Sequence, residues 1–161
     1  MINDNSFTIQ QAEFEDLKEI LNLQKVCYRE EAELYNDFTI PPLIQSIKSI
    51  EKDFEDQVFL KCVISGELAG SVRAEILDGS CKIGRLIVAE KYRRRGIGRK
   101  LMDAIENLDK FIKRFELFTG HLSSRNLALY EKLGYMQFKI KEINPKLRLV
   151  FMEKLNHRDE S

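Results

Sequence analysis

A short basic loop carries the clearest chemical signal in the sequence. Three arginines precede a Gly-x-Gly pair in the run Arg93-Arg94-Arg95-Gly96-Ile97-Gly98, and a helical pattern follows it. The first amides of a helix lack internal partners and carry partial positive charge, and glycine lets an anion approach the backbone. Arginine side chains add forked donors that suit phosphate oxygens. The loop, with Arg99 just after it, is therefore a candidate cradle for a diphosphate.

Two other kinds of phosphate loop do not match the residues that follow. A Walker A loop requires lysine and then serine or threonine after its last glycine, whereas Gly98 is followed by Arg99, Lys100 and Leu101. A dinucleotide fingerprint requires a third glycine where Leu101 lies, and an early βαβ unit that this chain lacks. Taken alone, a basic Gly-x-Gly at a helix start is a solvated turn as often as an anion site, so the neighbouring residues decide between the two.

The chain has the length and composition of one globular domain, which we expect to span residues 1–155, with a polar, frayed tail at 156–161. Basic and acidic residues number 26 each, so no overall field favours nucleic acid or an anionic membrane. The chain start lacks a secretory pattern, and no apolar run approaches the ~20 residues that span a bilayer. Cys27, Cys62 and Cys81 are typical of reduced thiols in a cytoplasmic protein, and neither a disulfide framework nor a metal site is expected.

The elements that position the loop follow from the apolar periodicity. Strand patterns occur at 7–10, 58–64, 68–76, 81–88, 116–119, 135–143 and 147–155. Helical spacing predicts helices that begin at Asp16 and Pro41, a long helix from Gly96 to Ile112 and a short one at 126–133, while 28–39 suggests a helix end and a mobile loop. Asp78-Gly79 predicts a tight hairpin, and Gly84 a bulge. This order predicts an α/β (mixed α+β) fold, with a central, mostly antiparallel sheet of about seven strands and helices on both faces.

Two stretches together resemble the motifs of the GNAT superfamily of N-acetyltransferases. The run from Arg85 to Gly98 is similar to the acetyl-coenzyme A motif L-x-V-x-P-x-x-[QR]-x-x-G-x-[GA], with Glu90 in the usual proline position. The run from Asn126 to Tyr135 is similar to the second motif, a helix that carries L-Y-x-x-x-G-[FY]. Two motifs at this separation are more specific than either alone, and the predicted element order matches the family fold over nearly all of the chain.

The resemblance implies acetyl-coenzyme A as the cofactor, with its pyrophosphate on the basic loop. The pantetheine arm would pair with the main chain at 86–88, where a backbone N–H could also stabilise an oxyanion. Many family members carry asparagine seven residues before the motif tyrosine, where this chain has Ser123. Asn126 lies four residues before that tyrosine, so the contact to the cofactor amide is open for either residue. The implied cofactor-binding residues are Leu86, Ile87, Val88, Arg93, Arg94, Arg95, Gly96, Ile97, Gly98, Arg99 and Asn126.

The same resemblance makes Tyr130 the candidate general acid, because a phenol of pKa about 10 can protonate a departing thiolate. The acceptor amine needs a base, and Glu75 and His121 are equal candidates. Arg73 shares a strand face with Glu75 and could bind a substrate carboxylate, although a solvated face explains both. Glu30 begins an acidic stretch that corresponds to a loop which often lines the family's acceptor site.

The function implied is acetyl transfer from acetyl-coenzyme A to a primary amine of a small molecule or peptide by direct attack. A non-catalytic acyl-coenzyme A sensor on the same fold is the alternative, since a fold does not determine its function. A nucleic-acid module is disfavoured, because the net charge is zero and no aromatic residue interrupts the basic cluster. The final strands often contribute to dimers in this family, so a homodimer is one option. Neither the acceptor nor the length of the acyl group follows from the sequence.

Overall fold

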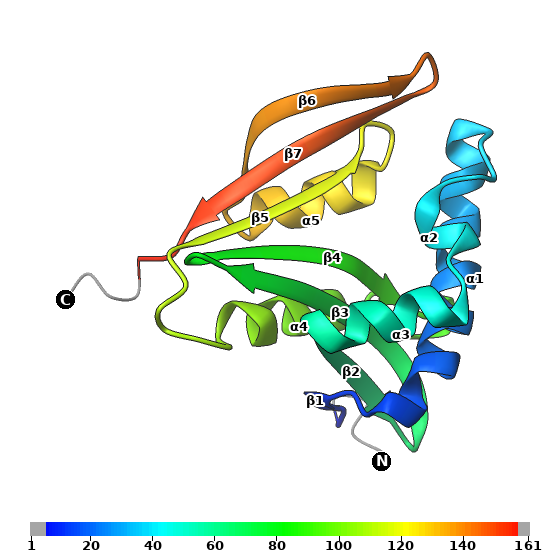
Figure 1. Cartoon of the computed structure of the whole chain (residues 1–161), viewed down its shortest axis with the longest axis vertical. Helices are drawn as coiled ribbons and strands as arrows, with labels where there is room; N and C mark the ends of the chain where they lie inside the picture. The colour runs from blue at the N-terminus through cyan, green and yellow to red at the C-terminus, as the bar shows by residue number, and fades with distance from the viewer. Residues whose placement is uncertain (1–5, 158–161) are drawn as a thin grey trace.

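A computed structural model describes residues 6–157, which fold around one seven-stranded sheet in the order β1-β2-β3-β4-β5-β7-β6 (Figure 1). The strands are β1 Thr8–Gln11, β2 Val58–Ile64, β3 Glu67–Leu77, β4 Ser80–Val88, β5 Arg114–Gly120, β6 Met136–Asn144 and β7 Leu147–Leu155. The helices are α1 Leu17–Tyr35, α2 Pro41–Ile44, α3 Ile47–Asp56, α4 Ile97–Glu106 and α5 Ser124–Lys132. The predicted mixed sheet of about seven strands is confirmed.

Every neighbouring pair of strands is antiparallel except β4 and β5, which are parallel. That parallel pairing covers only Ser80–Arg114, Cys81–Phe115 and Lys82–Glu116. Beyond it the two strands diverge, and Figure 1 shows the sheet opening like a V between them. This opening is the main departure of the sheet from regular pairing.

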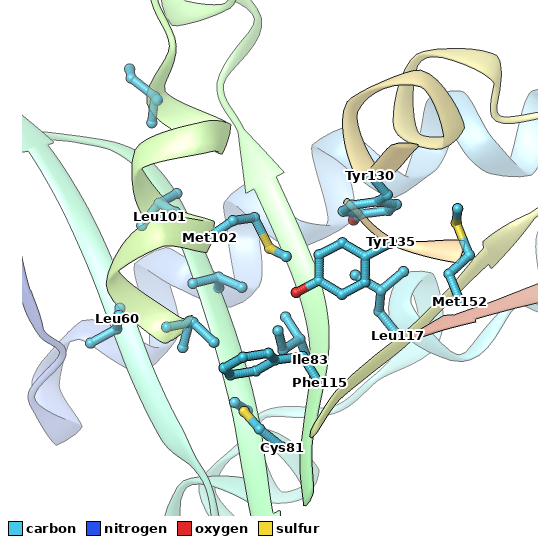
Figure 2. Close-up of a cluster of buried hydrophobic side chains, with 14 of the residues drawn as sticks. Leu60, Cys81, Ile83, Leu101, Met102, Phe115, Leu117, Tyr130, Tyr135 and Met152 are labelled. Atoms are coloured by element: carbon cyan, nitrogen blue, oxygen red, sulfur yellow. The ribbon is translucent and has the colours of Figure 1, made fainter. Parts of the chain in front are cut away.

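The core lies on both faces of the sheet. On one face α4 packs its buried side chains, among them Leu101, Met102 and Ile105, against sheet residues such as Phe115 (Figure 2). On the other face α1 and α3 pack against Phe59 of β2. The strongly amphipathic spacing of α4 and α3 explains why each helix buries one stripe and exposes the other. No helix within residues 6–157 combines the length and apolar character that a membrane crossing requires.

Three helices differ in extent from the sequence prediction. α1 continues through 28–35, where the sequence predicts a helix end and a mobile loop, because Ala32 and Tyr35 extend its buried stripe. The helix that starts at Pro41 stops at Ile44, and α3 begins afresh after Ser46, whose hydroxyl accepts the Ser49 N–H. α4 ends at Glu106, so its ten residues make it shorter than the nineteen of α1.

The hairpin at Asp78-Gly79 is confirmed. Both residues have left-handed φ values, 52° and 79°, as a tight two-residue turn requires. In the predicted tail, the backbone N–H of Asn156 donates to the Lys113 carbonyl and its side chain donates to the Ile112 carbonyl. Residues 158–161 of that tail lie outside the described residues.

Candidate active site

The site begins at the open edge of β4. Because β5 pairs with β4 only as far as Lys82, the β5-facing side of residues 83–88 has no strand partner. Two cavities lie along this edge and share four wall residues, namely Tyr28, Glu31, Leu86 and Asn126. We call them the cofactor cavity, of about 540 Å³, and the apolar cavity, of about 340 Å³.

A bulge in β4 lies beside the opening. The pairing with β3 shifts register between Ser71 and Arg73, and Arg85 adopts a left-handed φ of 53°. Gly84, at which the sequence predicts the bulge, is instead in regular register with Arg73. A bulge re-aims the side chains next to it, and a left-handed arginine is an uncommon, strained conformation. The strain therefore falls on Arg85, one residue beyond the predicted glycine.

The cofactor cavity brings together most of the residues predicted to hold the cofactor. The predicted residues in its wall are Leu86, Ile87, Val88, Arg93, Arg94, Gly98 and Asn126. Gly96 starts α4 with a left-handed φ of 79°, and a Cβ added there would have no atom within 4 Å. The loop thus leaves room beside the free amides of the first turn of α4.

The remaining loop residues lie elsewhere. Arg95, Gly96 and Arg99 line a separate hollow on the surface that also includes Phe7 and Lys154. The side chain of Ile97 is only 1% exposed and belongs to the core, so only its backbone could reach a ligand. The sequence pattern therefore locates the loop but does not separate its inward from its outward arginines.

Glu30 lines the cofactor cavity, where its carboxylate pairs with two arginine side chains. Arg93 donates from Nη1 to both Glu30 carboxylate oxygens at 3.1 Å, and Arg125 donates to Oε2 at 3.1 Å. Arg93 also donates from Nε to the Val88 carbonyl at 3.2 Å. Glu30 thus holds two guanidinium groups at the cavity wall and does not line the apolar cavity.

The apolar cavity is assembled from segments far apart in the chain. Its hydrophobic wall includes Ile40, Pro41, Pro42, Ile83, Leu86, Phe118, Ile143, Leu147 and Leu149. Its polar side chains are those of Tyr28, Glu31, Tyr35, Arg85, Thr119, Asn126 and Tyr130. A mostly apolar hollow with a few converging polar groups is typical of a small-molecule site.

Tyr130 projects from α5 into the apolar cavity and is 6% exposed. Burial raises the pKa of Tyr130 above its ordinary value, and the neighbouring Tyr28 and Glu31 raise it further. The phenol therefore stays protonated near neutral pH. Its ring packs edge-on against Tyr135 at 6.0 Å, and Figure 2 shows the two rings side by side.

Glu31 is the carboxylate at the junction of the two cavities. The Ser123 hydroxyl donates to its Oε2, and the Tyr35 hydroxyl lies 3.1 Å from the Ser123 oxygen. The Leu122 N–H donates to the Tyr35 hydroxyl at 3.0 Å. The consistent direction of donation runs from Leu122 through Tyr35 and Ser123 to Glu31, so the carboxylate is held in position by a chain of hydrogen bonds.

The two predicted base candidates line neither cavity. Glu75 is exposed near the far end of β3, opposite Lys82. His121 accepts the Arg148 N–H at Nδ1, at 3.0 Å, and its ring lies 5.6 Å from the Tyr35 ring. Both residues are therefore away from the groups that the structure brings together, which are Tyr130, Asn126 and the loop.

Arg73 lies behind the apolar cavity, buried to 4% exposure and absent from the cavity wall. Its Nη2 donates to Gln45 at 3.0 Å and lies 3.6 Å from an Asp53 oxygen, and its guanidinium stacks on Phe59. Burial lowers the pKa of Arg73 to about 10, and the positive charge of Arg85 contributes. Arg73 thus links β3 to α3 beneath the site.

The sequence model of the acetyltransferase (GNAT) family matches residues 17–135. The chain belongs to this family. Among curated proteins of Bacillus subtilis (strain 168), UPF0157 protein YqkA is 27% identical over 80% of this chain and 37% of its own length. A putative acetyltransferase of the same strain is 32% identical over 41% of this chain and 44% of its own length. The GNAT chain described here thus spans less than half the length of either curated relative.

Solved structures share the fold at low identity. Smu.2055 from Streptococcus mutans UA159 superposes with a TM-score of 0.79 at 19% identity, over 92% of this chain and 98% of that chain. The ribosomal-protein-S18-alanine N-acetyltransferase from Escherichia coli superposes with a TM-score of 0.75 at 18% identity, over 93% of this chain and 94% of that chain. The PaiA N-acetyltransferase from Thermoplasma acidophilum was solved in complex with coenzyme A. It superposes with a TM-score of 0.68 at 20% identity, over 94% of this chain and 99% of that chain.

The residues of this chain fit the coenzyme that the family implies. The open β4 edge offers unpaired backbone groups to an extended arm, and the cofactor cavity leads from it to the glycine loop. Gly98 and the guanidinium groups of Arg93 and Arg94 line the cofactor cavity near the start of α4, and they suit a diphosphate there.

Proposed function

We propose that this GNAT chain transfers an acetyl group from acetyl-coenzyme A to a primary amine by direct attack of the amine. The observation that carries the proposal is the meeting of two cavities at the open edge of β4. Glu31 of α1 and Tyr130 of α5 both project into the apolar cavity there. A base and an acid that share a cavity with a free strand edge are the parts that aminolysis of a thioester requires.

In this proposal the backbone of 86–88 and the glycine loop orient the cofactor, which supplies the acetyl group as a thioester. An unpaired N–H of β4 stabilises negative charge on the carbonyl oxygen during attack. Cys27 also lines the cofactor cavity, but burial raises its pKa, so the thiol is a weak nucleophile. Transfer without a covalent intermediate on this chain is therefore the simpler route.

Glu31 replaces Glu75 and His121 as our candidate base. An amine is mostly protonated at neutral pH and must lose a proton before it attacks. The carboxylate of Glu31 lies in the cavity wall with one oxygen fixed by Ser123, which leaves the other to accept that proton. Glu75 is exposed near the far end of β3, and His121 lies outside both cavities with its Nδ1 accepting the Arg148 N–H.

Tyr130 then donates its hydroxyl proton to the departing thiolate, and the second proton that the amine nitrogen loses as the amide forms returns through solvent to the phenolate. The raised pKa of Tyr130 keeps the phenol in the form that can donate. The acceptor is a small-molecule or peptide amine, and the free thiols Cys27, Cys62 and Cys81 fit a reducing compartment such as the cytoplasm.

The test measures thiol release from acetyl-coenzyme A with a panel of primary amines, alongside calorimetric binding of coenzyme A. Tyr130→Phe should lower kcat about 100-fold and leave the Kd of coenzyme A unchanged. Tyr92→Phe is the matched control, because the Tyr92 hydroxyl pairs with Glu67 outside both cavities. Tight cofactor binding without turnover of any amine would contradict the enzyme and favour the acyl-coenzyme A sensor.

A further inference from the structure

Arg85 is the arginine of the apolar cavity. It is half-buried in the wall of the apolar cavity, and its Nε is inaccessible to solvent and has no hydrogen-bond partner. Within residues 6–157 it forms no ion pair, and its one aromatic contact places the guanidinium carbon 6.0 Å from the centre of the Tyr28 ring. A buried N–H without an acceptor costs free energy, so the Nε of Arg85 favours a ligand that can accept a hydrogen bond from it.

The other arginines that are not solvent-exposed each have a nearby carboxylate, although Nη1 of Arg73 is also buried without a hydrogen-bond partner. Arg73 has Gln45 and Asp53, Arg93 has Glu30, and Arg114 lies 2.6 Å from both Glu116 and Glu153. Arg85 also sits close enough to Arg73 for the two positive charges to oppose each other. Among residues 6–157, Arg85 is thus the one arginine in this group that forms no ion pair, although the carboxylate of Glu31 lines the same cavity.

The conformation of the backbone at Arg85 determines where its side chain lies. Its left-handed φ of 53° lies at the register shift of β4, where a bulge turns side chains toward the opening. Strained residues of this kind cluster at ligand sites, where the surrounding structure holds them in place. A surface arginine with no role would not need this conformation.

We infer that the acceptor amine also carries a carboxylate, which Arg85 binds, and an apolar body, which the hydrophobic wall of the same cavity holds. The inference rests on the proposed function of this cavity. A guanidinium binds a carboxylate through two parallel hydrogen bonds, and Glu31 offers the opposite charge to the ammonium end. The volume of about 340 Å³ suits a molecule the size of a free apolar amino acid.

The kinetic test compares phenylalanine, phenylalaninamide and phenethylamine as acceptors, which differ only at the carboxylate. Wild-type kcat/KM should favour phenylalanine over the other two by about 30-fold, the loss typical of a buried charge pair deprived of one partner. Arg85→Met should reduce this preference to about threefold or less, because kcat/KM should fall far more for phenylalanine than for phenethylamine, and Arg85→Lys should retain part of the preference. Arg148→Met, an exposed arginine outside both cavities, is the matched control.

Equal rates for the three acceptors in the wild type, or an equal loss for all three in Arg85→Met, would overturn the inference and leave acetyl transfer intact. The second outcome would mean that Arg85 acts on the reaction or on folding. Circular dichroism of each variant separates these two causes.

A binding test does not depend on turnover. Calorimetry on the protein saturated with coenzyme A compares 3-phenylpropionate with 3-phenylpropanol, and the acid should bind at least about 30-fold more tightly. Arg85→Met should abolish that difference. Binding of the acid that is equal to the alcohol, absent, or insensitive to Arg85 contradicts the inference. Preference for the acid in a protein that acetylates no amine would support the carboxylate site and contradict the proposed function.

Discussion

The two cavities along the β4 edge are built in different ways. The cofactor cavity takes half of its wall from residues 86–98, with additions from α1 and α5. The apolar cavity draws on α1, on Ile40 to Pro42, on β4 and β5, on α5, and on the β6–β7 hairpin region. One side is thus local in sequence, and the other exists only after the sheet has formed.

The two sides also use different chemistry. The cofactor side depends on backbone groups and on a glycine with left-handed φ, which only a narrow set of residue types allows. The apolar side depends on side chains that many sequences could supply. A requirement on the backbone leaves a recognisable pattern in one short stretch, whereas a pocket assembled from distant side chains leaves none.

The two cavities also differ in whether their arginine side chains form ion pairs. At the cofactor cavity, Arg93 and Arg125 are held by Glu30. At the apolar cavity, Arg85 has no such partner among the described residues. The first site has its arginines oriented before a ligand arrives, while the second keeps an unmet charge for the ligand to neutralise.

The largest effect is expected at the cofactor loop. Gly96→Asp places a carboxylate beside the diphosphate and forces a left-handed φ of 79° on a side chain. Like charges at such a contact cost several kcal/mol, so the Kd of coenzyme A should rise about 1,000-fold in calorimetry.

Gly96→Asn is the matched control for that change, because asparagine has nearly the same shape, tolerates left-handed φ and carries no charge. Its Kd should rise about 10-fold or less. Unchanged affinity in a folded Gly96→Asp protein would remove the diphosphate from this loop.

The fold and the cofactor side are largely predictable from sequence, because their signals are local. The Asp78-Gly79 turn requires two left-handed residues, and the glycine loop lies where a strand pattern gives way to a helical one. The acidic composition of 28–35 hides the helix there, although Tyr28, Ala32 and Tyr35 keep helical spacing. The helix becomes evident only in the structure, because tertiary packing decides that Ala32 and Tyr35 are buried.

The acceptor side is not predictable in the same way. Glu31 and Tyr35 of α1 meet Ser123 only because α1 crosses the mouth of the V; the two residues precede Ser123 in the chain by 92 and 88 positions, respectively. Strand alternation places Glu75 on a face, but it cannot tell that the far end of that strand is exposed. The bulge that Gly84 predicts lies one residue further on, at Arg85, whose side chain we propose as the carboxylate site.

An intermediate effect should distinguish Glu31 from the other candidate bases. Glu31→Gln should lower kcat/KM about 100-fold at neutral pH, with recovery as the pH rises toward the pKa of the amine, because a neutral amine needs no base. Glu75→Gln and His121→Gln should change the rate less than about twofold. A loss at Glu75 or His121 that exceeds the loss at Glu31 would reverse the assignment.

The smallest effect tests the hydrogen-bond chain behind Glu31. A Cβ added to Gly120 would lie 1.9 Å from the Tyr35 hydroxyl oxygen, so Gly120→Ala must displace the ring that holds Ser123. Overpacking of this kind destabilises by about 2 kcal/mol in denaturant unfolding, and the loosened carboxylate should cost about 10-fold in kcat/KM. Gly84→Ala serves as the stability control, since its Cβ meets nothing within 4 Å. If Gly120→Ala lost stability but kept full activity, these hydrogen bonds would stabilise the fold, and the action of Glu31 would not depend on them.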